Sequence, residues 1–300
     1  LFSSVNYKIL DTDNEYKKDI EINVVEQATG EITAGAGYGS SGQTLSFGIK
    51  ENNFSGNATK LNTNLTITSK SIKGGFNVII PNYNSSDKSL RLNLSRASND
   101  YLSSSGYENT ITNFTLGTSF EYKQDLFFTP LIVLESEDLK TNTNASTALK
   151  KQDGNYNNVE LDYNFFYDKR DKTFRPTDGY YSSFDQTLPL LSNDYSISNK
   201  YDYRFYHKLS ENMISNISFH ISAINSLEGS NVRVSDRLFL SSRKLRGFEP
   251  GKIGPKDNLD FIGGNYASSA SISTTLPTTL PVLESIDFNI FFDAGNVWGV

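Results

Sequence analysis

Apolar and polar residues alternate along most of the chain, with the period of two that is typical of β-strands. The clearest run is residues 159–165, whose odd positions are Val, Leu, Tyr and Phe and whose even positions are Glu, Asp and Asn. Residues 200–209 and 216–222 repeat the pattern. It predicts that Tyr201, Tyr203 and Phe205 face one side of a sheet and that Lys200, Asp202 and Arg204 face the other.

The alternating runs are long and follow one another as in a meander. Many reach about 10 residues, close to the ~9–11 that cross a bilayer and longer than the average soluble strand of about 5–6. We count about fourteen strands after residue 30, and no stretch predicts a helix longer than a turn or two. The predicted connections are rich in Asn, Ser, Asp and Gly, and they lie at 81–87, 99–108, 139–155, 189–196 and 227–233.

This pattern predicts an all-β fold in which residues 33–296 form one antiparallel meander around an Asn- and Ser-lined interior. A soluble β-sandwich would alternate as well. The strand lengths favour a transmembrane β-barrel, and so do the 17 Tyr and 20 Phe residues, which recur near strand ends as an interfacial girdle requires. No run approaches the ~18 consecutive apolar residues of a membrane-spanning helix.

Composition narrows the classes of function. The net charge of −6 argues against nucleic acid as a partner. The chain has no cysteine, which excludes disulfides and thiolate metal sites. His207 and His220 are the only histidines, and their parity places them on opposite faces of different strands. We therefore predict no metal site, no cofactor and no catalytic residues; no Gly-x-Ser-x-Gly elbow is present, and His207 has no evident serine partner.

Residues 1–27 differ from the rest of the chain. Residues 5–10 and 19–26 alternate as two strands that are joined by a polar turn at 11–18. Two strands cannot bury a core by themselves. The segment is therefore either part of a small separate domain or the first hairpin of the larger sheet.

The first strand of the larger sheet carries glycine at alternate positions, Gly35, Gly37 and Gly39. A phosphate-binding glycine loop requires a helix directly after it, whereas another strand follows here. One face of this strand is nearly without side chains, so we expect it to pack loosely and to bend easily.

Alternation stops at residues 243–255, where Pro250, Gly251 and Gly254 follow a compact Arg246-Gly247-Phe248 tip. These residues predict a long loop between strands with one cation and one aromatic ring at its turn. An ordinary exposed loop has the same composition.

Alternation resumes near the end of the chain, before Gly295. Ile286, Phe288, Ile290 and Phe292 form one apolar face, which predicts that the alternate positions, Asp287, Asn289, Phe291 and Asp293, point into the interior. An aspartate at a strand end is also a common turn cap.

Several of these segments together resemble one family. Residues 245–248 with 253–255 resemble the loop-6 signature of BamA-like proteins, with Leu245 where valine is usual. The segments 53–56, 170–179, 262–265 and 291–295 resemble the Asn-Phe-x-Gly turn, the "R…PT.G" element, the entry to the strand after loop 6 and the Phe-x-Asp-x-Gly element, in family order. The chain thus resembles a C-terminal fragment of the BamA, TamA and two-partner-secretion superfamily.

The resemblance implies a domain organisation. Residues 1–27 would be the C-terminal part of the last POTRA domain, with Leu1-Phe2-Ser3 as the end of a preceding helix. Residues 28–300 would be an outer-membrane barrel of about sixteen strands that lacks its last strands. The implied location is the bacterial outer membrane, with the POTRA part in the periplasm.

The resemblance also implies function and sites. Such proteins insert other β-barrels into the outer membrane, and related exporters of the TamA or two-partner-secretion type are the alternative. The implied partners are unfolded barrel clients, accessory lipoproteins and outer-membrane lipids. The implied sites are the loop-6 motif (Leu245, Arg246, Gly247, Phe248, Gly254 and Pro255), its lumen partners (Asp293, Phe291 and Gly295) and the first strand of a lateral seam (Gly35, Gly37 and Gly39).

Overall fold

One antiparallel sheet of thirteen strands dominates the computed structural model, which describes residues 2–13, 16–39, 42–211, 213–229, 231–276 and 288–300. Its strands are β3 (Gly30–Gly39), β4 (Gly42–Phe54), β5 (Thr59–Thr68), β6 (Ser71–Ile80), β7 (Ser89–Tyr101), β8 (Tyr107–Lys123), β9 (Leu126–Thr141), β10 (Gly154–Asp168), β11 (Gly179–Leu191), β12 (Ser196–Ser210), β13 (Met213–Ser226), β16 (Tyr266–Leu276) and β17 (Phe288–Trp298). Each strand pairs with its neighbour in this order, so the predicted meander is confirmed.

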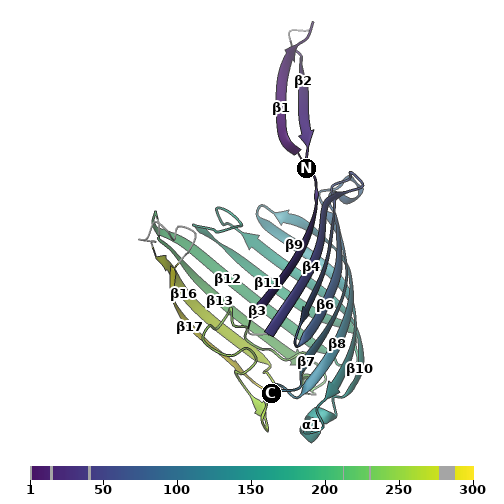
Figure 1. The fold of residues 1–300 in the computed structure, drawn as a ribbon, viewed down its shortest axis with the longest axis vertical. Helices are drawn as coiled ribbons and strands as arrows, with labels where there is room; N and C mark the ends of the chain where they lie inside the picture. Colours follow the sequence, from purple (N-terminus) through teal and green to yellow (C-terminus); the bar gives the residue numbers. More distant parts are fainter. Residues whose placement is uncertain (1, 14–15, 40–41, 212, 230, 277–287) are drawn as a thin grey trace.

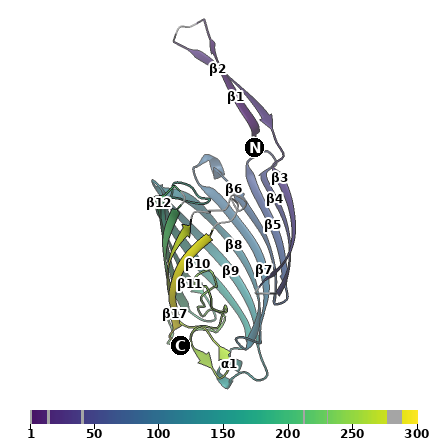
Figure 2. The ribbon, with the colours of Figure 1, turned by 60° about the vertical axis from the view of Figure 1, so that its left-hand side comes forward.

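The sheet curls around an interior, and β3 and β17 are its two end strands (Figures 1 and 2). Alternation along each strand separates two faces. Large apolar side chains such as Phe47, Leu94 and Ile221 are exposed on the outer face. Polar side chains such as Asn158 and Ser222 are buried on the inner face. The described part of the chain therefore has an apolar outside and a polar interior.

The strand count is one lower than predicted: the described residues form thirteen strands in this sheet rather than about fourteen. The difference lies before residue 243, where alternation continues but no strand forms. Residues 227–265 are one connection, which we call the long loop, and residue 230 in it lies outside the described residues. Val232 and Val234 are each 1% exposed and Arg233 between them is 2% exposed. Successive side chains of this segment are thus buried on both sides, whereas in a strand of this sheet every second side chain is exposed on the outer face.

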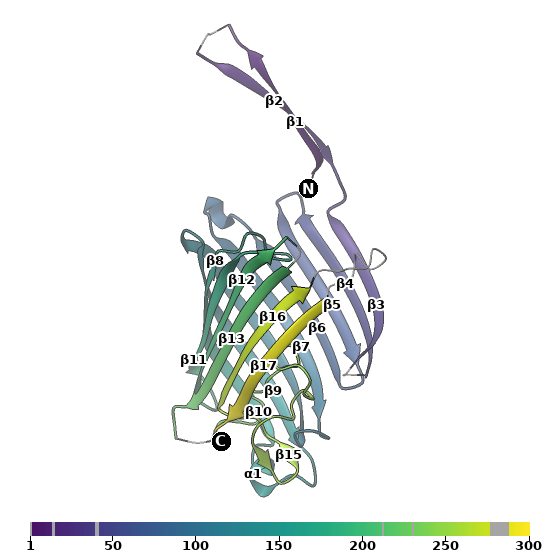
Figure 3. The same cartoon turned by 90° about the vertical axis from the view of Figure 1, so that its left-hand side faces the viewer.

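Residues 2–26 form a separate hairpin of β1 (Phe2–Asp11) and β2 (Lys18–Glu26), which projects from one end of the sheet (Figure 3). The expectation that a helix ends at residues 1–3 is wrong for Phe2 and Ser3, which lie in β1; Leu1 is outside the described residues. The Ser3 hydroxyl donates to the carbonyl of Val25 at 3.2 Å, which holds this end of β1 against β2.

The remaining elements are small. They are η1 (Tyr83–Ser85), α1 (Thr147–Lys150), β14 (Lys256–Asp257) and β15 (Asp260–Phe261). Within the described residues, no helix is long and apolar enough to cross a membrane. The turns 55–58, 81–88 and 169–178 lie at the same end of the sheet as the hairpin, whereas α1 lies at the opposite end (Figures 1 and 3). The long loop starts from that opposite end, because it follows β13, which runs away from the hairpin.

Candidate functional site

The long loop packs against the inner face of β16 and β17. Leu240 and Leu245 from the loop form a buried cluster with Ala267 of β16 and Val297 of β17. Close to this cluster, Leu238 and Gly264 exchange two backbone hydrogen bonds, of 2.8 and 3.1 Å. Burial of these apolar side chains stabilises the loop in the interior, which fixes the position of the adjacent tip.

Arg246 at the tip binds Asp293 of β17. Its Nε donates to Asp293 Oδ2 at 2.7 Å, and its Nη2 donates to Oδ1 at 2.6 Å. The Arg246 backbone N–H also donates to Oδ2, at 2.9 Å. The side chain of Asp293 is only 4% exposed. The planar guanidinium and the carboxylate thus meet in the two-bond geometry that makes such pairs directional.

Two further neighbours fix the guanidinium of Arg246. Its Nη2 donates to the hydroxyl of Ser271 on β16 at 2.8 Å, and its carbon lies 3.6 Å from the ring centre of Phe291. The cation therefore stacks on an aromatic face while its edge binds a carboxylate. Arg246 joins the loop to both β16 and β17.

Gly295 continues the inward row of β17. A Cβ atom there would lie 3.1 Å from Leu240 Cδ1 and 2.9 Å from the carbonyl oxygen of Ser268. The missing side chain makes room for the loop. The loop thus meets three residues of β17. It stacks on the ring of Phe291, binds the carboxylate of Asp293 and occupies the room left by the missing side chain of Gly295.

The other motif residues are placed less uniformly. Leu245 is buried, and the Pro255 carbonyl accepts a hydrogen bond from the Ile262 N–H at 3.1 Å. Gly254 has φ +105°, and a Cβ there would lie 2.8 Å from Val297 Cβ, so only glycine fits. Gly247 has φ +84°, which suits the turn at the tip. Phe248 is 56% exposed and does not join the buried cluster.

A second cation, Lys244, was not singled out from the sequence. Its Nζ donates to Asp202 Oδ1 on β12 at 2.8 Å and also contacts His220 Nδ1 on β13. The inward parity of Asp202 and His220 was visible in the sequence, but their contact with the loop was not. Lys244 and Arg246 together connect the tip to four strands.

His220 lies between Asp202 and Ser222, in the order of a serine hydrolase triad. Its Nδ1 is 2.9 Å from Asp202 Oδ1, and its Nε2 is 3.3 Å from the Ser222 hydroxyl. Lys244 Nζ also contacts Nδ1 and binds the same Asp202 oxygen, so the carboxylate is shared between the imidazole ring and a cation of the loop. The group is therefore an ion-pair network, and the described residues hold no cluster of metal-ligating side chains.

The glycine-bearing strand β3 pairs only with β4, so its other edge is unpaired within the described sheet. A Cβ at Gly37 would meet no atom within 4 Å, whereas one at Gly35 would lie 2.9 Å from the Ser46 hydroxyl. Gly39 is the last residue of the strand. β17 is the corresponding end strand on the other side of the sheet.

Comparison with solved structures places this architecture among known barrels. BamA from Haemophilus ducreyi lacking POTRA domains 1–3 superposes with a TM-score of 0.84 at 20% identity, covering 99% of this chain and 63% of that one. CdiB from Acinetobacter baumannii superposes with a TM-score of 0.58 at 12% identity, covering 98% of this chain and 55% of that one. These similarities show a shared fold.

Sequence comparison identifies the family. The chain is 32% identical over 165 residues to a SAM50-like protein of Schizosaccharomyces pombe; the match covers 51% of this chain and 34% of that relative, so it spans about a third of the relative's length. The model of the Omp85 superfamily domain matches residues 53–300. These matches confirm the resemblance drawn from the motifs, and the chain belongs to the Omp85 superfamily.

Proposed function

We propose that this protein assembles β-barrel proteins and inserts them into an outer membrane. Family membership supports a role in barrel assembly, and the outer face of the sheet has the chemistry of a lipid-facing surface. Phe47, Phe219 and Phe292 are examples of exposed aromatic side chains on it. In this proposal the thirteen strands are part of a transmembrane barrel.

The observation that carries the proposal is the row of alternate glycines on β3, an end strand of the described sheet whose outer edge would take part in the seam. An unpaired strand edge presents free N–H and C=O groups and accepts another strand by β-augmentation. The alternate glycines of β3 make its backbone accessible and pliable. A client strand would add to this edge and form a new hairpin that moves into the membrane, with β3 as one side of a lateral seam.

The long loop serves as a clamp in this proposal. Arg246 holds the tip to Asp293 and Ser271 on β16 and β17. These strands lie at the other end of the sheet from β3. The clamp therefore fixes a part of the barrel wall that is remote from β3 in the strand order.

The hairpin of β1 and β2 fits the role of a POTRA remnant in residues 1–27. Val5, Tyr7 and Ile9 pair with Val24, Ile22 and Ile20, and all six side chains are exposed. A two-stranded apolar face of this kind requires a covering layer for stability. We place this part in the periplasm of a bacterium, where it would receive unfolded barrel clients together with accessory lipoproteins, and residues 28–300 in the outer membrane with its lipids.

Site-specific cross-linking during assembly tests the proposal. The chain has no cysteine, so a single photoactivatable label at Gly37→Cys reports on β3 alone, and one at Thr115→Cys on strand β8, which pairs with Asn93 on the same polar face, is the matched control. In the full-length protein in lipid vesicles, we expect the label at position 37 to capture the terminal strand of a folding client barrel. Equal capture at both positions, or none at position 37 while the client folds, contradicts the proposal.

An exporter of the TamA or two-partner-secretion type is the alternative function. In that case the interior would conduct an extended polypeptide, and the label at position 37, which pairs with Thr44 on the polar inner face, would also capture that polypeptide. Translocation of a soluble polypeptide into the vesicles without barrel assembly would favour this alternative.

A further inference from the structure

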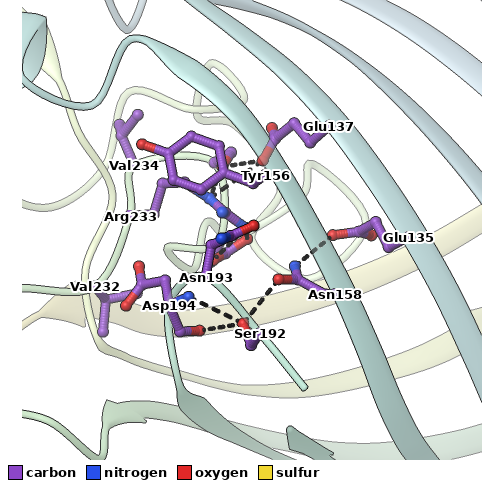
Figure 4. Close-up of polar contacts among 12 residues, drawn as sticks. Glu135, Glu137, Tyr156, Asn158, Ser192, Asn193, Asp194, Val232, Arg233 and Val234 are labelled. Atoms are coloured by element: carbon purple, nitrogen blue, oxygen red, sulfur yellow. Dashed lines mark hydrogen bonds and ion pairs between the residues drawn. The ribbon is translucent and has the colours of Figure 1, made fainter. Parts of the chain in front are cut away.

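The long loop contacts the interior wall a second time, far from Asp293. Figure 4 shows Arg233 of the loop beside Glu137 of β9 and Tyr156 of β10. Arg233 Nε lies 3.1 Å from Glu137 Oε2, and the guanidinium carbon lies 4.1 Å from the ring centre of Tyr156. The side chains of Arg233 and Glu137 are 2% and 1% exposed, so this ion pair is buried.

Glu137 has partners on both oxygens. Asn109 Nδ2 donates to Oε1 at 2.6 Å, and the Ser235 hydroxyl donates to Oε2 at 3.0 Å. Arg233 supplies the compensating charge. Without it, a carboxylate would stay buried and unpaired, which is among the most destabilising changes in a protein interior.

The backbone of the loop is also fixed at this point. The Val234 N–H donates to Gln152 Oε1 at 2.8 Å, and the Val234 side chain is buried in a cluster with Leu139 and Leu149. Arg233 also reaches Asp236 within the loop, with Nη2 2.9 Å from Oδ2. Residues 232–237 are therefore held to the wall by an ion pair, by a backbone hydrogen bond and by apolar packing.

The two contact regions lie on non-adjacent strands. Arg233 binds the wall at β9 and β10, and Arg246 binds it at β16 and β17. In the sheet, β11, β12 and β13 separate these pairs. A loop that is fixed at both ends thus spans the interior side of three strands.

We propose that Arg233 is a second anchor of the long loop, independent of Arg246, and that the loop is a brace between the β9–β10 wall and the β16–β17 end of the sheet. Arg233 is then a positioning residue for client insertion. The activity part of this inference rests on the proposed function, whereas the anchor itself does not. A brace with two anchors resists movement of β16 and β17 relative to the far wall, and such movement would accompany opening of a seam.

Amide hydrogen exchange of the full-length protein in lipid nanodiscs tests the anchor. Two amides report on the two ends: Val234, and Leu245, whose N–H donates to Ser241 O at 3.1 Å. We expect Arg233→Met to speed exchange at Val234 at least about tenfold and to leave Leu245 within about twofold. Arg246→Ala should give the reverse. The matched control is Arg243→Met, an exposed arginine of the same loop, which should change neither.

Equal acceleration at both amides in Arg233→Met, or no change at Val234, would overturn the independent anchor. Should Arg233→Met fail to fold, Arg233→Lys is the decisive variant. Lysine keeps the charge but lacks the planar guanidinium, which donates through several N–H groups and stacks on an aromatic ring. Exchange at Val234 in Arg233→Lys should therefore be faster than in wild type. This increase should be smaller than the increase at Leu245 in Arg246→Ala. Wild-type exchange at Val234 in this variant would contradict the role of the guanidinium.

Client folding in the same nanodiscs tests the positioning role. We expect Arg233→Met to slow assembly of a client barrel about threefold or more and Arg233→Lys to restore part of the rate. If Arg233→Met assembles the client at the wild-type rate although amide exchange at Val234 is faster, the positioning role is refuted. If the wild-type protein itself does not assemble the client, the proposed function fails, and the exchange data still decide whether the anchor exists.

Discussion

The guanidinium of Arg246 faces the carboxylate of Asp293 through two parallel hydrogen bonds of 2.7 and 2.6 Å, 47 residues apart in the chain. The carboxylate is almost fully buried, while a third of the arginine side chain stays accessible. The pair therefore combines a directional contact with partial desolvation. Both features determine how far the free energy of unfolding should fall when either residue is replaced.

Arg246→Ala or Asp293→Ala should each lower the free energy of unfolding by roughly 2–3 kcal/mol, because each leaves the other charge partly buried without its partner. The double variant should cost clearly less than the sum, with a coupling of about 1–2 kcal/mol. Denaturant unfolding of the protein in detergent micelles measures all four species. Strictly additive losses would show that the pair does not act as a unit.

Arg246→Lys should recover only part of the loss. Lysine supplies a charge but not the two-pronged donor, and it stacks less well on Phe291. Arg243→Ala is the matched control because Arg243 is exposed, and it should stay within about 0.5 kcal/mol of wild type.

Gly295→Ala should destabilise docking of the long loop, because the added methyl group would crowd Leu240 and the Ser268 carbonyl. Overpacking of this kind typically costs about 1–3 kcal/mol. Limited proteolysis of the loop measures the effect as faster cleavage. Gly37→Ala, where a Cβ meets nothing within 4 Å, is the control, and a similar cleavage rate in both variants would contradict the space-making role.

Amides on the free edge of β3 should exchange much faster than those of β10. β10 is paired on both sides, by β9 and β11, whereas β3 is paired only by β4. Half of the β3 amides therefore lack a partner from the described sheet. Exchange along residues 33–39 as slow as along 159–167 would show that another chain segment covers this edge.

The turn before β11 should lose stability in acid. Asp171 accepts hydrogen bonds from the Thr177 hydroxyl and from the N–H groups of Thr177 and Asp178, and these bonds lower the pKa of Asp171 from 3.8 to about 2. A carboxyl whose pKa is lower in the folded state stabilises it above its unfolded pKa. Its contribution is therefore lost as the pH falls from about 4 to 2.

Carboxyl carbon NMR of the protein in micelles measures this titration. Thr177→Val should move the pKa of Asp171 back toward its usual value, because the largest cause is the threonine hydroxyl. An unchanged titration in Thr177→Val would show that the backbone donors alone set the pKa.

Much of the sheet was predictable because alternation is a local signal. The faces of residues 159–165 and 200–209 follow from parity alone, and so does the inward direction of Phe291 and Asp293. The same local signal failed before residue 243. Alternation there reflects a loop whose valines and arginines are all buried against the wall, and a period of two cannot distinguish that from a strand.

The sequence by itself determined the family motifs, the two faces of the sheet and the residue types available for the clamp. Only the tertiary structure decided which charges meet. Ser235 and Glu137 are 98 residues apart, and Lys244 and Asp202 are 42 apart, so no local pattern connects them. Such contacts arise when strands that are distant in sequence curl around one interior and the long loop returns into it. The position of Arg233 opposite Glu137 is a property of that curled geometry and not of either segment alone.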